Sequence, residues 1–333
     1  MRCLIVGCGG IGHAHARALR ALGNVEIAAC VEPHAPAREA FSAAFGARGY
    51  EDLDACLAEW AGKVHFATVA STPATHYAVA KKVLSAGIPV MVEKPLAMDV
   101  REAGELAALA AARGLQLGVG FKMRFEPIFM KARELTGTLG PLRSVSSFKL
   151  QPRPRKPHHD WIPEVGAMYE LSVHEFDLIH WICGIKPRRV TARLEHPPGW
   201  TREAAFSAIV EYDGGVVGSL TGRFTNESRF FYRDLTLIVA GERGYMRIMR
   251  PDRIDLHVDE FSTIEVASGG NAFVDEFRAF VEAVERGELT GTADGQAGVW
   301  TTAMVEAAVL SDRHGRPAAI GERGDGGVEI RLD

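Results

Sequence analysis

The chain has 333 residues, 47% of them hydrophobic and 24% charged, a balance typical of a globular protein of about two domains. Its formal net charge of -4 and its scattered Lys and Arg residues argue against partners such as nucleic acid or an anionic membrane surface. The sequence shows neither a signal peptide nor a stretch of about 18 apolar residues. The 5 cysteines are odd in number and form no C-x-x-C pair, so they suggest neither a disulfide framework nor a zinc ribbon and fit a reducing cytoplasm.

Apolar strands alternate with helical patterns over the first third of the chain. Two Ala-rich amphipathic segments, 75–86 and 100–112, are typical of the helices between such strands. The predicted strands are Arg2–Val6, Val25–Val31, Val64–Val69, Pro89–Glu93 and Leu115–Gly120. This alternation predicts an α/β domain over residues 1–121 with a doubly wound parallel sheet, a Rossmann domain.

The first strand runs directly into a G-x-G-x-x-G motif that is typical of a dinucleotide site. Gly7 permits the tight turn, Gly9 lets the backbone approach a pyrophosphate, and Gly12 lets the next helix pack closely on the sheet. Gly10 and Ile11 complete the turn, and the pyrophosphate is expected at the N-terminus of the helix.

Glu32 ends the second predicted strand and indicates which cofactor the site takes. A carboxylate at this position accepts both hydroxyls of an adenosine ribose and repels a 2′-phosphate. The residues that follow Glu32 are Pro33 and His34, and the first arginine is Arg38. The sequence therefore predicts NAD rather than NADP.

The tripeptide Glu93-Lys94-Pro95 follows the fourth predicted strand at its carboxyl end, where ligands bind in open α/β sheets. A lysine there is able to reach a substrate that lies on the nicotinamide, and Pro95 fixes the backbone, conceivably through a cis bond. The alternative is an exposed lysine at a strand end, which is common.

Residues 122–312 change to a β-rich pattern and predict a substrate-binding and oligomerisation domain of α+β type. Hairpins are expected around Asp213-Gly214-Gly215 and Glu242-Arg243-Gly244, and helices over 272–286 and 294–310, the last of which is able to pack back on the first domain. The sheet is expected to be large, open and mostly antiparallel. Its free face predicts a homodimer or homotetramer. Residues 313–333 are polar and Gly-rich, and predict a weakly ordered tail.

A predicted helix over 170–177 carries acids and an imidazole. Spacings of four and three place Glu170, His174 and Asp177 on one helix face. The same pattern suits half a metal site that the ligands His158, His159 and Asp160 would complete. Hydride transfer to NAD needs no metal, however, and no H-E-x-x-H occurs, so no metal is expected. A solvated helix face is the third interpretation.

Together these residues resemble the glucose-fructose oxidoreductase, inositol dehydrogenase and MocA family, Gfo/Idh/MocA. The resemblance covers nearly the whole chain. It rests on the glycine motif with His15, Ser71-Thr72-Pro73 with His76, Ala86-Gly87, Glu93-Lys94-Pro95-Leu96, Gly120-Phe121, Arg124-Phe125, Leu139-Gly140-Pro141, Trp161, Gly166, His174, Asp177, Trp181 and Gly184.

The resemblance implies a dehydrogenase that acts on a secondary alcohol of a sugar, cyclitol or nucleotide sugar, with Lys94 and His174 as the catalytic pair and Glu170 as the helix acid. It implies further NAD contacts from Ser71, Thr72, Pro73, His76, Glu93 and Lys94, and substrate contacts from Lys94, Lys122, Arg124, Trp161, Glu170 and His174. Three departures reshape the substrate pocket: Glu170 replaces the usual Asp, Val165-Gly166-Ala167 replaces a glycine run, and Lys122 replaces Asn.

Oxidation of an alcohol needs a base for the hydroxyl proton, and the sequence leaves Lys94 and His174 open for this role. Two other functions also remain open. One is an NAD-dependent glycoside hydrolase or eliminase that oxidises its sugar only transiently. The other is a sensor that binds NAD without turnover, although such a protein has no need of both Lys94 and His174.

Overall fold

The computed structural model describes residues 1–154, 161–228, 234–288, 292–324 and 327–333. The chain forms two compact units. Unit 1 comprises Met1–Lys122 and Gly270–Val299, and unit 2 comprises Met123–Gly269 and Trp300–Asp333. The first boundary lies one residue from the expected one, but 270–299 was expected in the second domain. Its helix α9 (Ala272–Arg286) carries Phe277 and Phe280 into the core of unit 1, which accounts for the difference.

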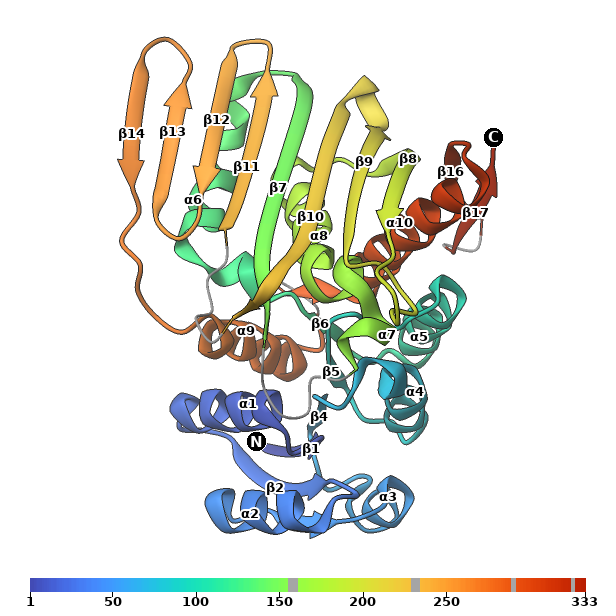
Figure 1. Cartoon of the computed structure of the whole chain (residues 1–333). Coiled ribbons are helices and arrows are strands. Elements are labelled where there is room, and N and C mark those ends of the chain that lie inside the picture. Colours follow the sequence, from blue (N-terminus) through green and yellow to red (C-terminus); the bar gives the residue numbers. More distant parts are fainter. Residues whose placement is uncertain (155–160, 229–233, 289–291, 325–326) are drawn as a thin grey trace. The chain divides into compact units, whose positions relative to one another are not determined.

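Unit 1 is built on a seven-stranded sheet in the order β15-β6-β5-β4-β1-β2-β3 (Figure 1). All strands run parallel except the short β15, which pairs antiparallel with β6. The strands are β1 (Arg2–Val6), β2 (Glu26–Val31), β3 (Arg48–Tyr50), β4 (Phe66–Val69), β5 (Val90–Glu93), β6 (Leu117–Gly120) and β15 (Ala293–Asp294). This is the doubly wound order, so the predicted Rossmann domain is confirmed.

Helices connect the strands of unit 1, as parallel pairing requires. The Asp52 and Asp99 side chains cap α3 and α5 by accepting from backbone N–H groups. The helical elements are α1 (Gly10–Leu22), α2 (Ala35–Phe45), α3 (Leu53–Trp60), η1 (Pro73–Thr75), α4 (His76–Ser85), α5 (Val100–Arg113) and α9.

Unit 2 holds a ten-stranded sheet in the order β14-β13-β12-β11-β7-β10-β9-β8-β16-β17. Only the pair β7 and β10 runs parallel among the described ladders, so the predicted mostly antiparallel sheet is confirmed. The strands are β7 (Leu142–Pro154), β8 (Pro187–Glu195), β9 (Ala205–Tyr212), β10 (Val217–Ser228), β11 (Asp234–Gly241), β12 (Gly244–Met249), β13 (Arg253–His257), β14 (Phe261–Glu265), β16 (Ala318–Glu322) and β17 (Val328–Leu332).

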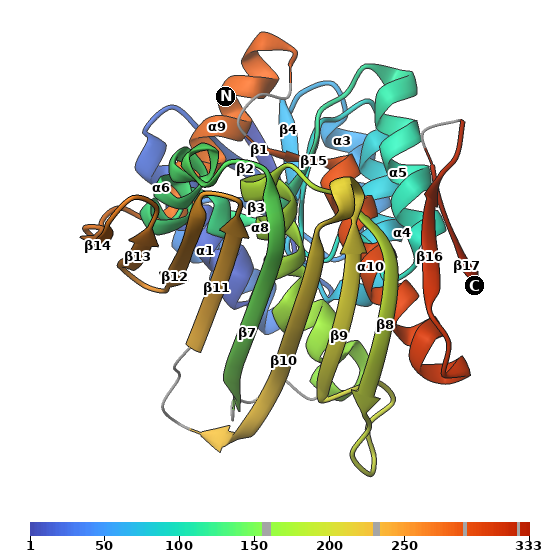
Figure 2. The same cartoon turned by 90° about the horizontal axis from the view of Figure 1, so that it is seen from above.

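Helices lie along one face of this sheet, α6 against β12 and α8 against β7 (Figure 2). Buried and exposed side chains alternate along strands such as β9, and the exposed ones lie on the opposite face of the sheet. The helical elements of unit 2 are η2 (Lys122–Phe125, which begins in unit 1), α6 (Pro127–Thr136), η3 (Gly137–Leu139), α7 (Ile162–Ala167), the π-helical η4 (Met168–Ser172), α8 (Val173–Cys183) and η5 (Asp213–Gly215). The long α10 (Gly295–His314) begins in unit 1 and continues in unit 2.

The C-terminal segment corrects an expectation, because its described residues are not a weakly ordered tail. β16 and β17 pair antiparallel with each other, and β16 adds to the edge strand β8. Ala318 and Ile320 are buried at alternate positions, which is the period of a half-buried strand. The polar and glycine-rich composition of the segment hid this short pattern.

All five cysteines are free thiols. Within the described ranges, no helix has the length and apolarity needed to cross a membrane.

Candidate functional site

The glycine turn after β1 is shaped by close backbone contacts in unit 1. Gly7 has a φ of 96°, and a Cβ there would come within 2.6 Å of the Ala70 backbone. A Cβ on Gly12 would lie 2.0 Å from the carbonyl oxygen of Gly7. A Cβ on Gly9, by contrast, would meet no atom within 4 Å. The turn is therefore tight on its protein side and open above Gly9, as approach of a pyrophosphate requires.

Helix α1 starts at Gly10, directly after this open position. Its N-cap Gly9 supplies no side-chain hydrogen bond, and the first turn of this fully described helix contains no acidic residue. Its backbone N–H groups and positive dipole end thus suit an anionic ligand. These features fit the diphosphate of NAD.

Glu32 lies beside the turn with both carboxylate oxygens fixed. Oε2 accepts from the backbone N–H of Cys8 at 3.0 Å, and Oε1 accepts from that of His34 at 3.1 Å. The Arg38 guanidinium donates to the carbonyl oxygen of Glu32 at 2.6 Å and to that of Pro33 at 3.1 Å. The anion stays partly exposed at the end of β2, where the ribose diol of NAD would meet it.

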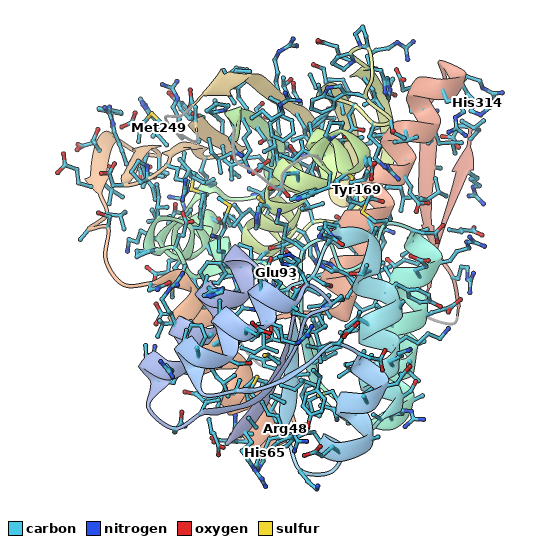
Figure 3. All side chains as sticks on the ribbon, turned by 60° about the horizontal axis from the view of Figure 1, so that its bottom comes forward. Arg48, His65, Glu93, Tyr169, Met249 and His314 are labelled. Carbon is cyan, nitrogen blue, oxygen red and sulfur yellow. The ribbon has the colours of Figure 1, made fainter. Side chains whose placement is uncertain are left out.

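Glu93 ends β5 and lies at the opposite end of unit 1 from Arg48 and His65 (Figure 3). It is only 8% exposed, and its Oε1 lies 2.9 Å from Nε2 of His15 while Oε2 accepts from the backbone N–H of Lys94 at 3.2 Å. Burial raises the pKa of the Glu93 carboxyl, but the hydrogen bond and charge of His15, with Lys94 and Lys122, outweigh burial and hold that pKa below its usual range. The carboxylate thus supports the start of the loop that carries Lys94.

His76 is buried and bonded within the protein. Its Nδ1 lies 2.7 Å from the carbonyl oxygen of Pro95, and its Nε2 lies 3.1 Å from that of Ser71. Burial lowers the pKa of His76, although both backbone contacts oppose the effect. His76 thus lies between the carbonyl oxygens of two loops. Ser71 and Thr72 retain exposed surface, whereas Pro73 is buried in the first turn of η1.

The predicted helix that carries Glu170 and His174 consists of two parts, a π-helical turn followed by an α-helix. Glu170 lies in the π-helical η4, where the N–H of Val173 bonds the carbonyl oxygen of Met168, five residues back, and His174 lies in α8. Four residues span slightly less than one turn of a π-helix and slightly more than one turn of an α-helix, so the placement of Glu170 and His174 on one helix face is compatible with this turn and stays a prediction. π-turns are frequent at functional sites.

The third member of that predicted face, Asp177, has a separate structural partner. Its oxygens accept from Arg124 Nε at 2.8 Å and Nη2 at 2.5 Å, and the two side chains are at most 9% exposed. Glu175, which directly follows His174 in α8, accepts from Nζ of the buried Lys149 at 2.7 Å. A solvated helix face is therefore excluded. Arg124, predicted as a substrate contact, holds α8 through its pair with Asp177.

Two more expected substrate residues have neighbours in their own units. The ammonium of Lys122 lies 4.3 Å from the centroid of the Phe273 ring. Trp161 packs against the small core cluster of Ile162, Ala167, Leu171 and Phe224 and stays partly exposed.

Glu203 is a contributor that sequence reasoning missed. Its Oε1 accepts from the backbone N–H of Met168 at 2.8 Å, and its carbonyl oxygen accepts from that of Ala167 at 2.8 Å. Gly166 adopts a φ of 84° beside it, and a Cβ there would come within 2.5 Å of Glu203 Oε1. Glu203 therefore fixes the start of the π-turn, and its distance of 35 residues from Met168 hid the contact.

The described residues contain no group of three or more His, Cys, Asp or Glu side chains arranged to hold a metal ion. The additional ligands considered for a metal, His158, His159 and Asp160, lie outside the described residues.

Comparison with known families matches both units. Residues 1–121 match the oxidoreductase family with an NAD-binding Rossmann fold, and residues 129–247 match the Gfo/Idh/MocA C-terminal domain. The chain belongs to the Gfo/Idh/MocA family. The family assignment and the NAD-binding domain predicted from the sequence are thereby confirmed.

Gfo/Idh/MocA relatives align along nearly the whole chain. The inositol 2-dehydrogenase of Rhizobium meliloti is 24% identical over 95% of this chain and 98% of its own. A myo-inositol dehydrogenase of Streptomyces leeuwenhoekii is 28% identical over 90% of this chain and 92% of its own. Among solved structures, GenD2 from gentamicin A biosynthesis, in complex with NAD, is 26% identical, with a TM-score of 0.83 over 96% of each chain.

Proposed function

We propose that this protein is an NAD-dependent dehydrogenase that oxidises a secondary alcohol of a sugar, cyclitol or nucleotide sugar. The observation that carries the proposal is the place of Lys94. It follows β5 at the carboxyl edge of the sheet that also carries the glycine turn after β1. Ligands of doubly wound sheets bind along that edge. The full-length similarity to inositol dehydrogenases supports a polyol as the substrate class.

The residues proposed to hold NAD are those that shape the open edge of unit 1. The turn Gly7-Cys8-Gly9-Gly10-Ile11-Gly12 and the start of α1 suit the diphosphate, Glu32 suits the adenosine ribose, and Ser71 and Thr72 offer exposed hydroxyls on the next loop. When bound, NAD supplies the acceptor for a hydride from the alcohol carbon. The polar atoms of Glu93 and His76 are bonded within the protein, so these two residues contribute by holding the Lys94 loop in place.

The alcohol proton must leave while the hydride departs, and we assign its transfer to Lys94 and His174. A lysine amine and an imidazole are both able to accept and return a proton at a substrate hydroxyl. The buried ion pairs of Asp177 and Glu175 hold α8 and so restrict the backbone around His174. Either side chain serves as the base in this proposal, with the other as a hydrogen-bond donor to the same oxygen.

Glu170 is proposed as the acid that contacts the substrate hydroxyls or supports His174. Its partial exposure in the π-turn agrees with a side chain that meets a ligand. Lys122 and Trp161 remain proposed substrate contacts. Arg124 also remains a proposed substrate contact, and its ion pair with Asp177 fixes its position.

A panel assay tests this function against its two rivals. Incubation with NAD and a set of inositols, hexoses and nucleotide sugars should give steady production of NADH with at least one substrate. A hydrolase or eliminase that oxidises transiently would convert substrate without net NADH. A sensor would bind NAD and convert none of the panel.

We further infer that copies of the chain associate through the open face of the unit 2 sheet. That face presents Ile209 at 50% and Phe148 at 46% exposure. Ile209 also lines a depression that residues of β8, β9 and β10 form, among them Thr191, Arg193, Ser207, Ser219 and Thr221. Light scattering after gel filtration should give a dimer or tetramer, and Ile209→Glu should shift it toward the monomer. An unchanged mass for the variant would contradict this surface.

A further inference from the structure

Two buried histidines of unit 1 flank the segment Glu93-Lys94-Pro95. His15 belongs to α1 and His76 begins α4, and each is 1% exposed. His15 bonds the residue directly before Lys94, and His76 bonds the residue directly after it. The lysine therefore lies between two anchored neighbours, and neither histidine takes part in the proposed transfer of hydride or proton.

The contact of His15 belongs to a continuous chain of hydrogen bonds. Its Nδ1 lies 2.7 Å from the Thr68 hydroxyl, and its Nε2 lies 2.9 Å from Oε1 of Glu93. An ionised carboxylate only accepts, so the imidazole donates to Glu93 from Nε2. The other Glu93 oxygen accepts from the backbone N–H of Lys94 at 3.2 Å. The chain thus runs from the buried strand β4 to the backbone of Lys94.

The surroundings of this chain leave it little room to move. The rings of Phe273 and Phe277 from α9 meet the His15 imidazole edge to face, with centroids 5.6 and 4.8 Å away. On the other side, a Cβ on Gly120 would lie 3.1 Å from Cδ of Glu93. The position of the carboxylate is therefore set by packing as well as by hydrogen bonds.

The contact of His76 fixes the loop on the far side of Lys94. Both neighbours of its ring nitrogens are carbonyl oxygens, at 2.7 Å for Pro95 and 3.1 Å for Ser71. Burial lowers the pKa of His76 and favours the neutral ring, which has a single N–H to donate. The shorter contact places that proton on Nδ1, as donor to Pro95.

We propose that His15 and His76 form a histidine clamp, a pair of positioning residues that hold the backbone of Lys94 at the carboxyl end of β5. The inference rests on the proposed function, because the place of Lys94 matters to the rate only if Lys94 acts on the substrate. A displacement of about 1 Å in a catalytic group is able to lower a rate about a hundredfold. Such a clamp therefore affects turnover without contact with the substrate.

Kinetics of paired variants test the clamp. His15→Leu and His76→Leu should each lower kcat about tenfold to a hundredfold, while the Kd of NAD changes by less than about threefold. His15→Gln should restore most of kcat, because its amide nitrogen replaces the Nε2 donor. His76→Asn should do the same, because its amide nitrogen replaces Nδ1. The assay uses the panel substrate with the highest turnover by the wild type.

His65→Leu is the matched control in the same unit. His65 also bonds backbone, since its Nδ1 accepts from the N–H of Arg2 at 2.9 Å, but it lies at the opposite end of the unit (Figure 3). Its replacement should leave kcat unchanged.

Two further measurements need no substrate. Nitrogen-15 NMR of the histidine rings should show a proton on Nε2 of His15 and on Nδ1 of His76. Hydrogen exchange of the Lys94 amide should accelerate at least about tenfold in His15→Leu and stay unchanged in His65→Leu.

The outcomes separate the clamp from the proposed function. If the wild type oxidises no polyol, the proposed function fails, and the NMR and exchange results still decide whether the clamp exists. If the wild type is active, unchanged kcat in both Leu variants overturns the clamp. The clamp is also overturned if Nε2 of His15 carries no proton. The same holds if the Leu variants lose kcat, NAD affinity and fold stability together and neither His15→Gln nor His76→Asn restores them.

Discussion

Oε2 of Glu32 accepts a hydrogen bond from the backbone N–H of Cys8 at 3.0 Å, which joins the end of β2 to the glycine turn after β1. One side chain thus orders the turn where the diphosphate of NAD is expected and also places a negative charge at the expected position of the ribose. Arg38 lies next to it, bonded to the carbonyl oxygens of Glu32 and Pro33.

Replacement of Glu32 should change the cofactor preference. In Glu32→Ser the anion that repels a 2′-phosphate is gone, while Arg38 stays beside the position where that phosphate would bind. We expect the ratio of the Kd values for NAD and NADP to shift toward NADP by at least about tenfold, or about 1.4 kcal/mol. Fluorescence titration of both cofactors measures it, with the double variant Glu32→Ser, Arg38→Ala as the control that should lose the gain. An unchanged ratio would show that Glu32 does not set the preference.

Lys94→Ala should lower kcat at least about a hundredfold and leave the Kd of NAD within several fold, because a base acts mainly in the transition state. Lys94→Arg keeps the positive charge but does not release its proton near neutral pH, so it should be impaired to a similar degree. Steady-state kinetics with parallel NAD titrations separate the two effects. A loss of NAD binding that matches the loss of turnover would make Lys94 a structural residue.

Five strands of unit 1, β1, β2, β4, β5 and β6, could be predicted from sequence because each is a short apolar run that ends in turn residues, whereas the short β3 and β15 lack such a run and were not predicted. β1 agrees with its predicted bounds, and β2, β4, β5 and β6 begin one or two residues later than predicted. Predictions of this kind rest on the local alternation of apolar and polar residues. They failed for β16 and β17, where a polar and glycine-rich composition hid that alternation. The place of α9 in unit 1 depends on the packing of Phe277 and Phe280, which no local pattern contains.

The candidate site was predictable only as far as its residues are close in the sequence. The glycine turn and Glu32 follow from spacing alone. The contacts from His15 to Glu93 and from Arg124 to Asp177 join residues 78 and 53 positions apart, and the fold alone brings them together. The π-turn at Glu170 was hidden as well, because sequence spacing was interpreted with the period of an α-helix.

Glu170→Gln should reduce kcat more than Glu170→Asp. The Gln variant loses the negative charge that supports a protonated imidazole or binds hydroxyls, whereas Asp keeps the charge and only shortens the reach. We expect a loss of about tenfold or more for Gln and a smaller one for Asp. A pH series of kcat/KM for the three proteins is the measurement. Near-full activity of the Gln variant at every pH would remove Glu170 from the catalytic set.

The buried Glu203 predicts a pH-dependent effect on stability. Burial raises the pKa of its carboxyl, although the N–H of Met168 opposes the shift, so the folded chain binds this proton more tightly than the unfolded chain. The stability linked to this proton is present at low pH and is lost as the pH rises through the pKa in the folded state.

Glu203→Gln removes the charge and keeps an oxygen that accepts from Met168. The variant should therefore have a higher free energy of unfolding than the wild type at about pH 8, and the difference should shrink as the pH falls toward about 4.3, the usual pKa of Glu. Urea unfolding across that range measures the difference. A difference that stays constant with pH would show that Glu203 titrates alike in both states.

Transfer of deuterium from substrate to cofactor tests the central claim most directly. The wild type is incubated with NAD and a polyol deuterated at its secondary carbinol carbons, and the cofactor and polyol are analysed by mass spectrometry. The account predicts reduced cofactor that carries one deuterium, together with an equal amount of ketone, and formation of both products at least about a hundredfold slower in Lys94→Ala. The account would be contradicted if NAD binds to the protein but no polyol of the panel transfers deuterium to the cofactor.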